Sequence, residues 1–255
     1  MDMIVIMKQT MDTEENVVLV EGRIQEDGVR FIMNPYDEYA VEEAVRLREA
    51  FGGTVTIVSI GPDRVEASMR TALAMGADQG VLVDDESLFG DEWTTSKVLA
   101  SVIRSRPFDL ILTGNMSVDN GSGQTGPRVA EELDIPHVSS VTKLTVEGSR
   151  LTVERDAEGD TETVELRLPA LVTVQQGLNE PRYPSLPGIM KAKKKPINRI
   201  GAAELGVNVG EVQPKTRVIH QYVPPKRGAC QLLAGDAQTQ ASDLVQLLRN
   251  AAKVI

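Results

Sequence analysis

Short apolar runs alternate with amphipathic stretches over the first half of the chain. Residues 3–7 (MIVIM) and 110–113 (LILT) are apolar almost throughout, as in strands buried on both faces. Residues 54–60 (TVTIVSI) and 81–83 continue this series of predicted strands. The series favours a mostly parallel sheet, because parallel strands are joined by helices that cover both faces.

Helical patterns fill the gaps between these runs. Asn34 can cap a helix and Pro35 suits its first turn. Positions 40, 44, 47 and 51 are apolar and share one helical face, and the glycines at 52 and 53 end the helix. Further helices are predicted over residues 62–75 and 95–104 and from about residue 126. The alternation predicts a Rossmann-like α/β fold of the adenine-nucleotide-binding type.

The pattern changes after residue 136. Segments of alternating polar and apolar residues follow at 141–146, 151–155, 161–167 and 171–175, with Glu-Gly and Glu-Gly-Asp turn sequences between them. Alternation with a period of two, broken by such turns, is typical of hairpins. We therefore expect an antiparallel extension of the parallel sheet.

Beyond residue 196 the strand signals become weak. Two prolines at 224 and 225 interrupt the chain, and a last amphipathic helix carries Leu244, Val245, Leu247 and Leu248. We expect a domain over residues 1–196 and a C-terminal arm over residues 197–255. An arm that ends in an apolar helix needs a surface to lie on, which is either its own domain or another subunit.

Composition narrows the class of protein. The chain has 255 residues, of which 41% are hydrophobic and 25% charged, and its formal net charge of −10 disfavours binding to nucleic acid. We find no run of about 18 apolar residues and no signal or transit peptide, so we expect a cytoplasmic protein without membrane insertion. Cys230 is the only cysteine, and His137 and His220 are the only histidines, so neither a disulfide nor a metal site is expected.

A glycine-rich segment follows the fourth predicted strand. Gly121, Gly123 and Gly126 form a G-x-G-x-x-G pattern at the opening of a helix. The position after the fourth strand does not fit the fingerprint of a dinucleotide dehydrogenase, which follows the first. The small residues, the Gln124 and Thr125 side chains and the positive end of the helix dipole nevertheless predict a phosphate cradle. A glycine turn without a ligand is the alternative.

Other segments reach the same predicted edge of the sheet. Ligands of open α/β sheets bind beyond the carboxyl ends of the strands, where Ile6, Ile60 and Gly114 are expected. The isoleucines could contact an adenine and residues 34–37 could hydrogen-bond its edge, unless both isoleucines belong to the core. Asp119 would be repelled by a phosphate, so we expect it to bind a ribose hydroxyl or its own loop. The sequence contains no phosphate-loop lysine motif, nucleophile elbow or Ser/His/Asp set, so no catalytic residues are assigned.

Residues 178–196 (LNEPRYPSLPGIMKAKKKP) suit neither a core element nor a flexible linker. Their prolines restrict the backbone and disfavour a continuous helix or strand, so we predict an exposed loop of defined shape. Leu186, held by Pro184 and Pro187, is then a candidate anchor for a partner protein.

A lysine run that includes Lys193 and Lys194 follows this anchor in an otherwise acidic chain. A partner with an apolar socket and carboxylates at its rim would fit the combination of leucine and lysines. A solvated proline loop with a surface lysine run is the alternative.

Four of these segments together resemble the beta subunit of electron-transfer flavoprotein. They are NPYDEYAVEEAVRLRE at 34–49, RTALAMGAD at 70–78, DNGSGQTGP at 119–127 and LNEPRYPSLPGIMKAKKKP at 178–196. The resemblance extends from residue 3 to about residue 195. It implies a heterodimer in which an alpha subunit holds the redox-active FAD and the beta subunit carries AMP. It also implies an electron carrier, without catalytic residues of its own, that accepts electrons from flavin dehydrogenases of the acyl-CoA type.

The resemblance implies roles for particular residues. The AMP site would be formed by Ile6, Asn34, Pro35, Tyr36, Asp37, Ile60, Gly114, Asn115, Asp119, Asn120, Gly121, Ser122, Gly123, Gln124 and Thr125. Tyr36 and residues 8–12 resemble positions near the flavin. Residues 178–196 resemble the family's recognition loop, whose leucine, here Leu186, docks into acyl-CoA dehydrogenases. The arm over 197–255 would pack on the alpha subunit.

Three alternatives stay open. One branch of the family binds FAD in the beta-subunit site and splits electron pairs, and residues 115–122 would decide between AMP and FAD. A stand-alone adenine-nucleotide-binding protein would fit the parallel core but would leave the proline-rich segment and the arm unexplained. An ATP-using ligase of the ATP-pyrophosphatase type would require a phosphate-loop lysine and a metal constellation, for which the sequence has no candidates.

Overall fold

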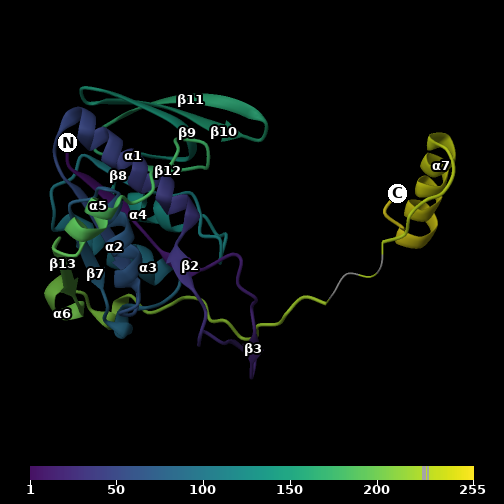
Figure 1. Ribbon diagram of the computed structural model, residues 1–255, viewed down its shortest axis with the longest axis horizontal. Coiled ribbons are helices and arrows are strands. Elements are labelled where there is room, and N and C mark those ends of the chain that lie inside the picture. Colours follow the sequence, from purple (N-terminus) through teal and green to yellow (C-terminus); the bar gives the residue numbers. More distant parts are fainter. Residues whose placement is uncertain (226–227, 229) are drawn as a thin grey trace.

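The centre of the molecule is a nine-stranded sheet covered by helices (Figure 1). The computed structural model describes residues 1–225, 228 and 230–255. The strand order is β11-β10-β9-β12-β8-β1-β6-β7-β13. The parallel centre contains β1 (Met3–Ile6), β6 (Val55–Ile60), β7 (Gln79–Val83) and β8 (Leu110–Gly114), each close to a predicted strand. The predicted mostly parallel α/β fold is confirmed.

Two layers of helices cover the two faces of this sheet. One core joins the sheet to α1 (Pro35–Phe51) and α2 (Val65–Met75), and a second joins it to α3 (Glu92–Arg104) and α4 (Thr125–Leu133). Helix α3 begins three residues before the predicted position 95, because the Asp91 side chain caps it. Of the four apolar positions predicted to share one face of α1, Ala40, Ala44 and Leu47 are buried, whereas Phe51 at the end of the helix is 52% exposed.

The predicted antiparallel extension is present but smaller than expected. Strands β9 (His137–Glu147), β10 (Arg150–Ala157) and β11 (Asp160–Arg167) pair antiparallel. Strand β12 (Ala170–Val174) does not continue this extension. It inserts between β8 and β9 and runs parallel to both, and all five of its residues are buried. A strand buried on both faces belongs to the core of a parallel sheet, so including 171–175 in the extension was incorrect.

Short elements complete the body. Strands β2 (Gln9–Met11) and β5 (Phe31–Met33) form one antiparallel pair, and β3 (Leu19–Val20) and β4 (Arg23–Ile24) form another. The 3-10 turns are η1 (Glu86–Leu88) and η2 (Val209–Glu211).

The first part of the predicted arm belongs to the body. Strand β13 (Ile197–Ile200) pairs in parallel with β7 at the sheet edge, and α6 (Ala202–Leu205) follows it. Val212, further along, is buried in the core that contains α3. The strand over 197–200 was not predicted, because its four residues, INRI, give too short an apolar signal.

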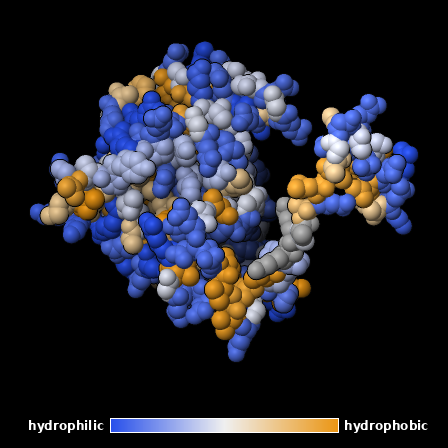
Figure 2. Space-filling view, turned by 45° about the vertical axis from the view of Figure 1, so that its right-hand side comes forward, coloured by the Kyte–Doolittle hydropathy of each residue, from blue (hydrophilic) through white to orange (hydrophobic). Residues whose placement is uncertain are grey.

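The end of the chain is different. Helix α7 (Ala237–Leu247) and the π-helical turn η3 (Leu248–Ala252) form close to the predicted place and stand apart from the body in Figure 1. Leu244 and Val245 of α7 are 48% and 43% exposed. Figure 2 also shows apolar side chains, in orange, at the lower edge of the body and on the separate part at the right. These surfaces have no cover within the described part of the chain.

The proline-rich segment is tied to α1. Arg182 donates to both carboxylate oxygens of Glu42, at 2.8 Å and 3.0 Å, and to Glu49 at 2.6 Å and 3.1 Å. The Asn179 amide donates to the Tyr39 carbonyl at 3.1 Å and to Glu43 at 2.9 Å. Residues 178–185 therefore have one fixed path over the helix.

The second half of that segment is a helix, contrary to prediction. Helix α5 (Leu186–Ala192) begins where Ser185 accepts a hydrogen bond from the Gly188 N–H at 3.1 Å. Pro187 lies in the first turn, where the absence of an N–H breaks no intrahelical bond, so it starts the helix rather than preventing it. The exposure of Leu186 is confirmed, at 81%.

We expect Arg182→Lys to lower the free energy of unfolding by about 1 to 2 kcal/mol. Lysine keeps the charge but cannot bond Glu42 and Glu49 through a planar fork, and Glu42 is only 4% exposed. Arg46→Lys is the matched control. Arg46 lies on α1 and forms only a 3.7 Å ion pair with Glu43, so this substitution should change the free energy of unfolding by less than about 0.5 kcal/mol. Denaturant unfolding of the full chain measures both, and equal effects would contradict the tether.

Candidate functional site

A cavity of about 630 Å³ opens beyond the carboxyl ends of β1, β6 and β8. Its volume lies within the range of small-molecule sites, about 300 to 1,000 Å³. Eleven of the predicted residues line it: Ile6, Asn34, Asp37, Ile60, Gly114, Asn115, Asn120, Ser122, Gly123, Gln124 and Thr125. Pro35, Tyr36, Asp119 and Gly121, which were also predicted, are not among its lining residues. The structure thus brings most of the predicted set into one place.

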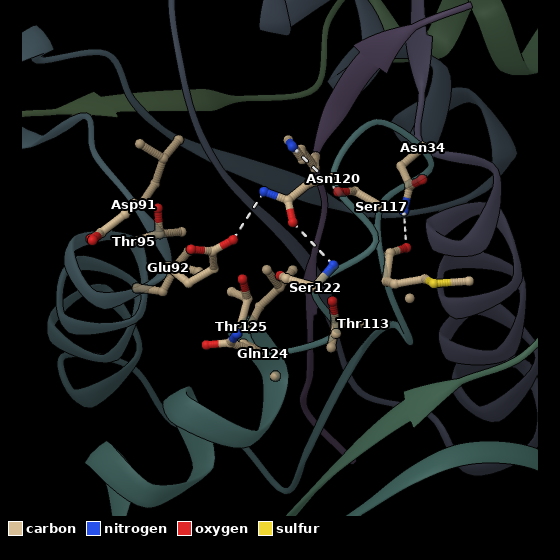
Figure 3. Close-up of a pocket in the computed structure, with 18 of the residues that line it drawn as sticks. Asn34, Asp91, Glu92, Thr95, Thr113, Ser117, Asn120, Ser122, Gln124 and Thr125 are labelled. Carbon is tan, nitrogen blue, oxygen red and sulfur yellow. Dashed lines mark hydrogen bonds between the residues drawn. The ribbon is translucent and has the colours of Figure 1, made fainter. Parts of the chain in front are cut away.

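The floor of the cavity is fixed by the first turn of α1. The buried Asp37 carboxylate accepts hydrogen bonds from the Lys8 N–H at 2.7 Å and the Gly114 N–H at 2.9 Å, just beyond β1 and at the end of β8. Asn34 holds the next loop, because its amide donates to the Met116 carbonyl at 2.9 Å (Figure 3). Asn34 stands at the predicted N-cap position but makes no side-chain cap there.

Gly114 is required by this close approach. A Cβ at this position would lie 2.6 Å from Tyr36 Cβ and would also collide with the Asp37 carboxylate. Only glycine lets the end of β8 approach α1 this closely. Tyr36 therefore belongs to the wall behind the cavity rather than to its lining.

The predicted phosphate cradle lies at the start of α4. Gly121 and Gly123 have positive φ angles of 71° and 62°, which favour glycine, and they turn the chain into the helix. No side chain caps α4, so its first N–H groups keep their binding capacity at a helix end that favours anions. Ser122, Gln124 and Thr125 lie together there in Figure 3. The Gln124 side-chain oxygen accepts from Arg128 at 3.1 Å and 2.9 Å, a contact that does not use the NH₂ group predicted to donate to a phosphate.

Opposite the cradle lies an acidic wall that sequence reasoning missed. Asp91 and Glu92, at the start of α3, line the cavity. Figure 3 shows Asn120 between the two sides: its amide donates to Glu92 at 2.9 Å and its oxygen accepts from the Ser122 N–H at 3.0 Å. The signal was available, because the helix after β7 also starts at this edge of the sheet.

Two further parts of the site differ from expectation. Asp119 forms an ion pair with Lys8, with Nζ and Oδ1 2.7 Å apart, a partner that sequence reasoning did not name. Residues 214–218 contribute Pro214, Thr216, Arg217 and Val218 to the lining. They were assigned to an arm on a partner, so sequence reasoning missed them.

The described residues contain no group of three or more His, Cys, Asp or Glu side chains that could hold a metal ion. No helix in the described part of the chain is both long enough and apolar enough to span a membrane.

Asp37 should make stability depend on pH. Burial raises its pKa from 3.8 to about 7, although hydrogen bonds from Lys8, Asn34 and Gly114 oppose this. The folded chain thus binds the proton more tightly than the unfolded chain, so this contribution is complete below pH 3.8 and is lost as the pH rises through about 7. We expect the free energy of unfolding to fall by a few kcal/mol, roughly, across this interval. Denaturant titrations at several pH values measure it, and the same slope in Asp37→Asn would contradict the assignment.

Comparison with known proteins gives one consistent family. The Electron transfer flavoprotein domain family matches residues 22–205. Electron transfer flavoprotein subunit beta of Bacillus subtilis (strain 168) is 51% identical over 257 residues, covering 100% of both chains. The subunit beta of Sus scrofa is 41% identical over 232 residues, which is 89% of this chain and 88% of the relative. That of Syntrophomonas wolfei subsp. wolfei is 38% identical over 252 residues, 98% of this chain and 97% of the relative.

These relatives are named as subunits of electron transfer flavoproteins, which agrees with an electron-transfer role and an alpha-subunit partner for this chain. The resemblance inferred from four sequence segments is confirmed over nearly the whole chain. The chain belongs to the electron transfer flavoprotein beta-subunit family.

Proposed function

We propose that this chain is the beta subunit of a heterodimeric electron carrier and holds one structural AMP in the cavity beyond β1, β6 and β8. The observation that carries the proposal is the cavity itself, which combines apolar walls, a polar floor and an uncapped helix end. The carrier would accept electrons from acyl-CoA type flavin dehydrogenases and pass them to a further acceptor. FAD bound mainly by the alpha subunit would supply the redox chemistry.

The cavity suits the parts of a nucleoside monophosphate. Ile6 and Ile60 end neighbouring strands and offer apolar contacts to an adenine. The backbone of residues 123–126 at the start of α4 offers N–H groups to a phosphate. Asn34, between these two regions, has both amide atoms engaged with residues 116 and 118, so it would fix the loop rather than the ligand.

The partner-facing surface is proposed at the end of the chain. The apolar residues Val218, Ile219, Tyr222 and Val223 are at least 60% exposed, and α7 exposes Leu244 and Val245. Exposed apolar groups of this kind are typical of surfaces that another subunit covers. We therefore keep the alpha subunit as the proposed support for the arm, now beginning after the residues that line the cavity, at about residue 218, rather than at residue 197.

Helix α5 is proposed as the docking site for the dehydrogenase. Leu186 is 81% exposed, and Met190 on the next turn is 63% exposed. The helix is held rigidly on α2. Arg70 donates to the carbonyls of Ala192 and Lys195 at 2.8 Å and 2.7 Å, and Lys195 Nζ donates to the Leu73 carbonyl at 2.9 Å. An apolar anchor on a preorganised support loses little entropy on binding, which suits a carrier that docks briefly.

We expect the purified heterodimer to contain one AMP and one FAD, identified by release and mass spectrometry. Gly123→Ala should lower AMP affinity about tenfold, equivalent to about 1.4 kcal/mol. The added methyl group would lie in the cavity wall, 3.4 Å from the Asn115 carbonyl oxygen. Gly121→Ala is the matched control, because it has the same backbone strain but does not line the cavity.

Other bound nucleotides would change the proposed function. Two FAD and no AMP would move the chain to the electron-splitting branch. AMP without a flavin-containing partner would favour a stand-alone nucleotide-binding protein.

We expect Leu186→Ala to slow dehydrogenase-coupled flavin reduction more than tenfold at low partner concentration, because burying a leucine contributes on the order of 2 kcal/mol. AMP and FAD contents should not change, since the side chain is 81% exposed. The exposed lysines contribute about 1 kcal/mol or less each, so the double change Lys193→Gln and Lys194→Gln should give a milder defect that fades with salt. Unchanged kinetics for Leu186→Ala would contradict the docking assignment, and loss of cofactor would make this leucine structural.

A further inference from the structure

Residues 212–218, here called the strap, cross the start of α3 on their way out of the body. Val212 is buried in the core, and its carbonyl accepts from the Thr94 hydroxyl at 2.7 Å. From there the strap passes along the cavity. Four of its residues line the cavity: Pro214, Thr216, Arg217 and Val218. This segment lies outside strands and helices, so its backbone N–H and C=O groups need other hydrogen-bond partners. Contacts other than secondary structure must therefore fix the position of the strap.

Asp91 provides these contacts with one side of its carboxylate. Its Oδ2 accepts from the Lys215 N–H at 2.8 Å, the Thr216 N–H at 2.8 Å and the Thr216 hydroxyl at 2.9 Å. Its Oδ1 faces the other way and caps α3 by accepting from the Thr94 N–H at 3.1 Å. Burial acts to raise the pKa of Asp91, but these hydrogen bonds together lower it to about 2. The group is therefore an ionised acceptor at neutral pH.

The surroundings are shaped for the strap. A Cβ on Gly90 would lie 2.6 Å from the Thr94 hydroxyl oxygen and 2.8 Å from Pro214 Cγ, so glycine is needed where the strap crosses the start of α3. Lys215 Nζ lies 5.3 Å from the centre of the Trp93 ring, a cation–π distance. Several contacts thus hold the strap at the same place, and three of its hydrogen bonds end on the one side chain of Asp91.

We infer that Asp91 is a positioning residue that keeps the strap closed over the cavity and so sets how fast a bound nucleotide enters and leaves. The inference deepens the proposed function and rests on it for the ligand. On the opposite side the cavity is bounded by the glycine-rich loop and α4, and α4 packs against the sheet. The strap and the glycine-rich loop both lie outside strands and helices. The glycine-rich loop is fixed at both ends, by β8 and α4, whereas the strap is fixed in the core only at Val212. Opening the strap would therefore widen the cavity without moving a strand or helix.

Asp91→Asn tests this directly, because asparagine caps a helix as well as aspartate does, whereas its NH₂ group cannot accept from Lys215 and Thr216. We expect radiolabelled AMP to leave the assembled protein at least about tenfold faster into excess unlabelled AMP, equivalent to about 1.4 kcal/mol in the barrier. Uptake of AMP by nucleotide-stripped protein should also become faster. A residue that only contacted the ligand or supported the fold would not speed up both.

Asp85→Asn is the matched control. Asp85 also uses one oxygen to accept from a turn N–H, that of Ser87 at 3.0 Å, and the other to hold a separate segment through the Ala202 N–H at 3.0 Å. It does not line the cavity. We expect AMP exchange in this variant to match the wild type. Hydrogen exchange at Lys215 and Thr216 should rise only in Asp91→Asn, which reports the strap without any ligand.

The outcomes separate this inference from the proposed function. If Asp91→Asn exchanges AMP at the same rate as the wild type, the inference is overturned, while the assignment of AMP to the cavity stands. FAD in place of AMP would overturn the AMP assignment, and the same exchange measured with FAD would then decide on the strap. If the wild-type protein holds neither AMP nor FAD, both the inference and the proposed function are overturned. If Asp91→Asn fails to fold, Thr216→Val, which removes one of the three bonds, should still give a smaller acceleration, and none would contradict the inference.

Discussion

The arrangement around the cavity depends on one buried carboxylate. Parallel strands leave N–H groups without ladder partners where they end, and Asp37 supplies acceptors to two of them, at Lys8 and Gly114. Removing the carboxylate from water is unfavourable, as its raised pKa records. In return the ends of β1 and β8 and the start of α1 form one rigid unit. A ligand bound there would not have to order the floor beneath it.

The sequence predicted those parts of the structure whose signals are local. Continuous apolar runs marked the central strands, and the strand-end rule placed Ile6, Ile60 and the glycine-rich loop at one edge. The helix at Leu186 was missed because prolines were taken as helix breakers, although Pro187 stands in a first turn. Strand β12 was misassigned because ALVTV after three hairpin strands resembles a fourth, while its burial on both faces is a property of the assembled sheet.

The part of the site formed by the strap was missed for a different reason and could not be predicted. Lys215 and Thr216 bind Asp91 mainly through backbone N–H groups, which every residue except proline carries, so no residue type marks the contact. Asp91 and the strap are also more than a hundred residues apart in the chain. Their juxtaposition follows from the crossing of α3 near Val212, which only the packed core determines. Side-chain patterns predict faces and turns, whereas such backbone contacts appear only in three dimensions.

Two of the exposed apolar surfaces in the described part of the chain differ in physical character. The surface at the end of the chain is extended and includes α7, which lies away from the body, so burying it would require a large interface of the permanent kind. Helix α5 exposes a few apolar residues on a support fixed by Arg70, Lys195 and Arg182. A small, preordered anchor gives specificity with limited buried area and allows rapid release. One chain can therefore suit both a lasting subunit contact and repeated brief encounters, because the two demands fall on separate surfaces.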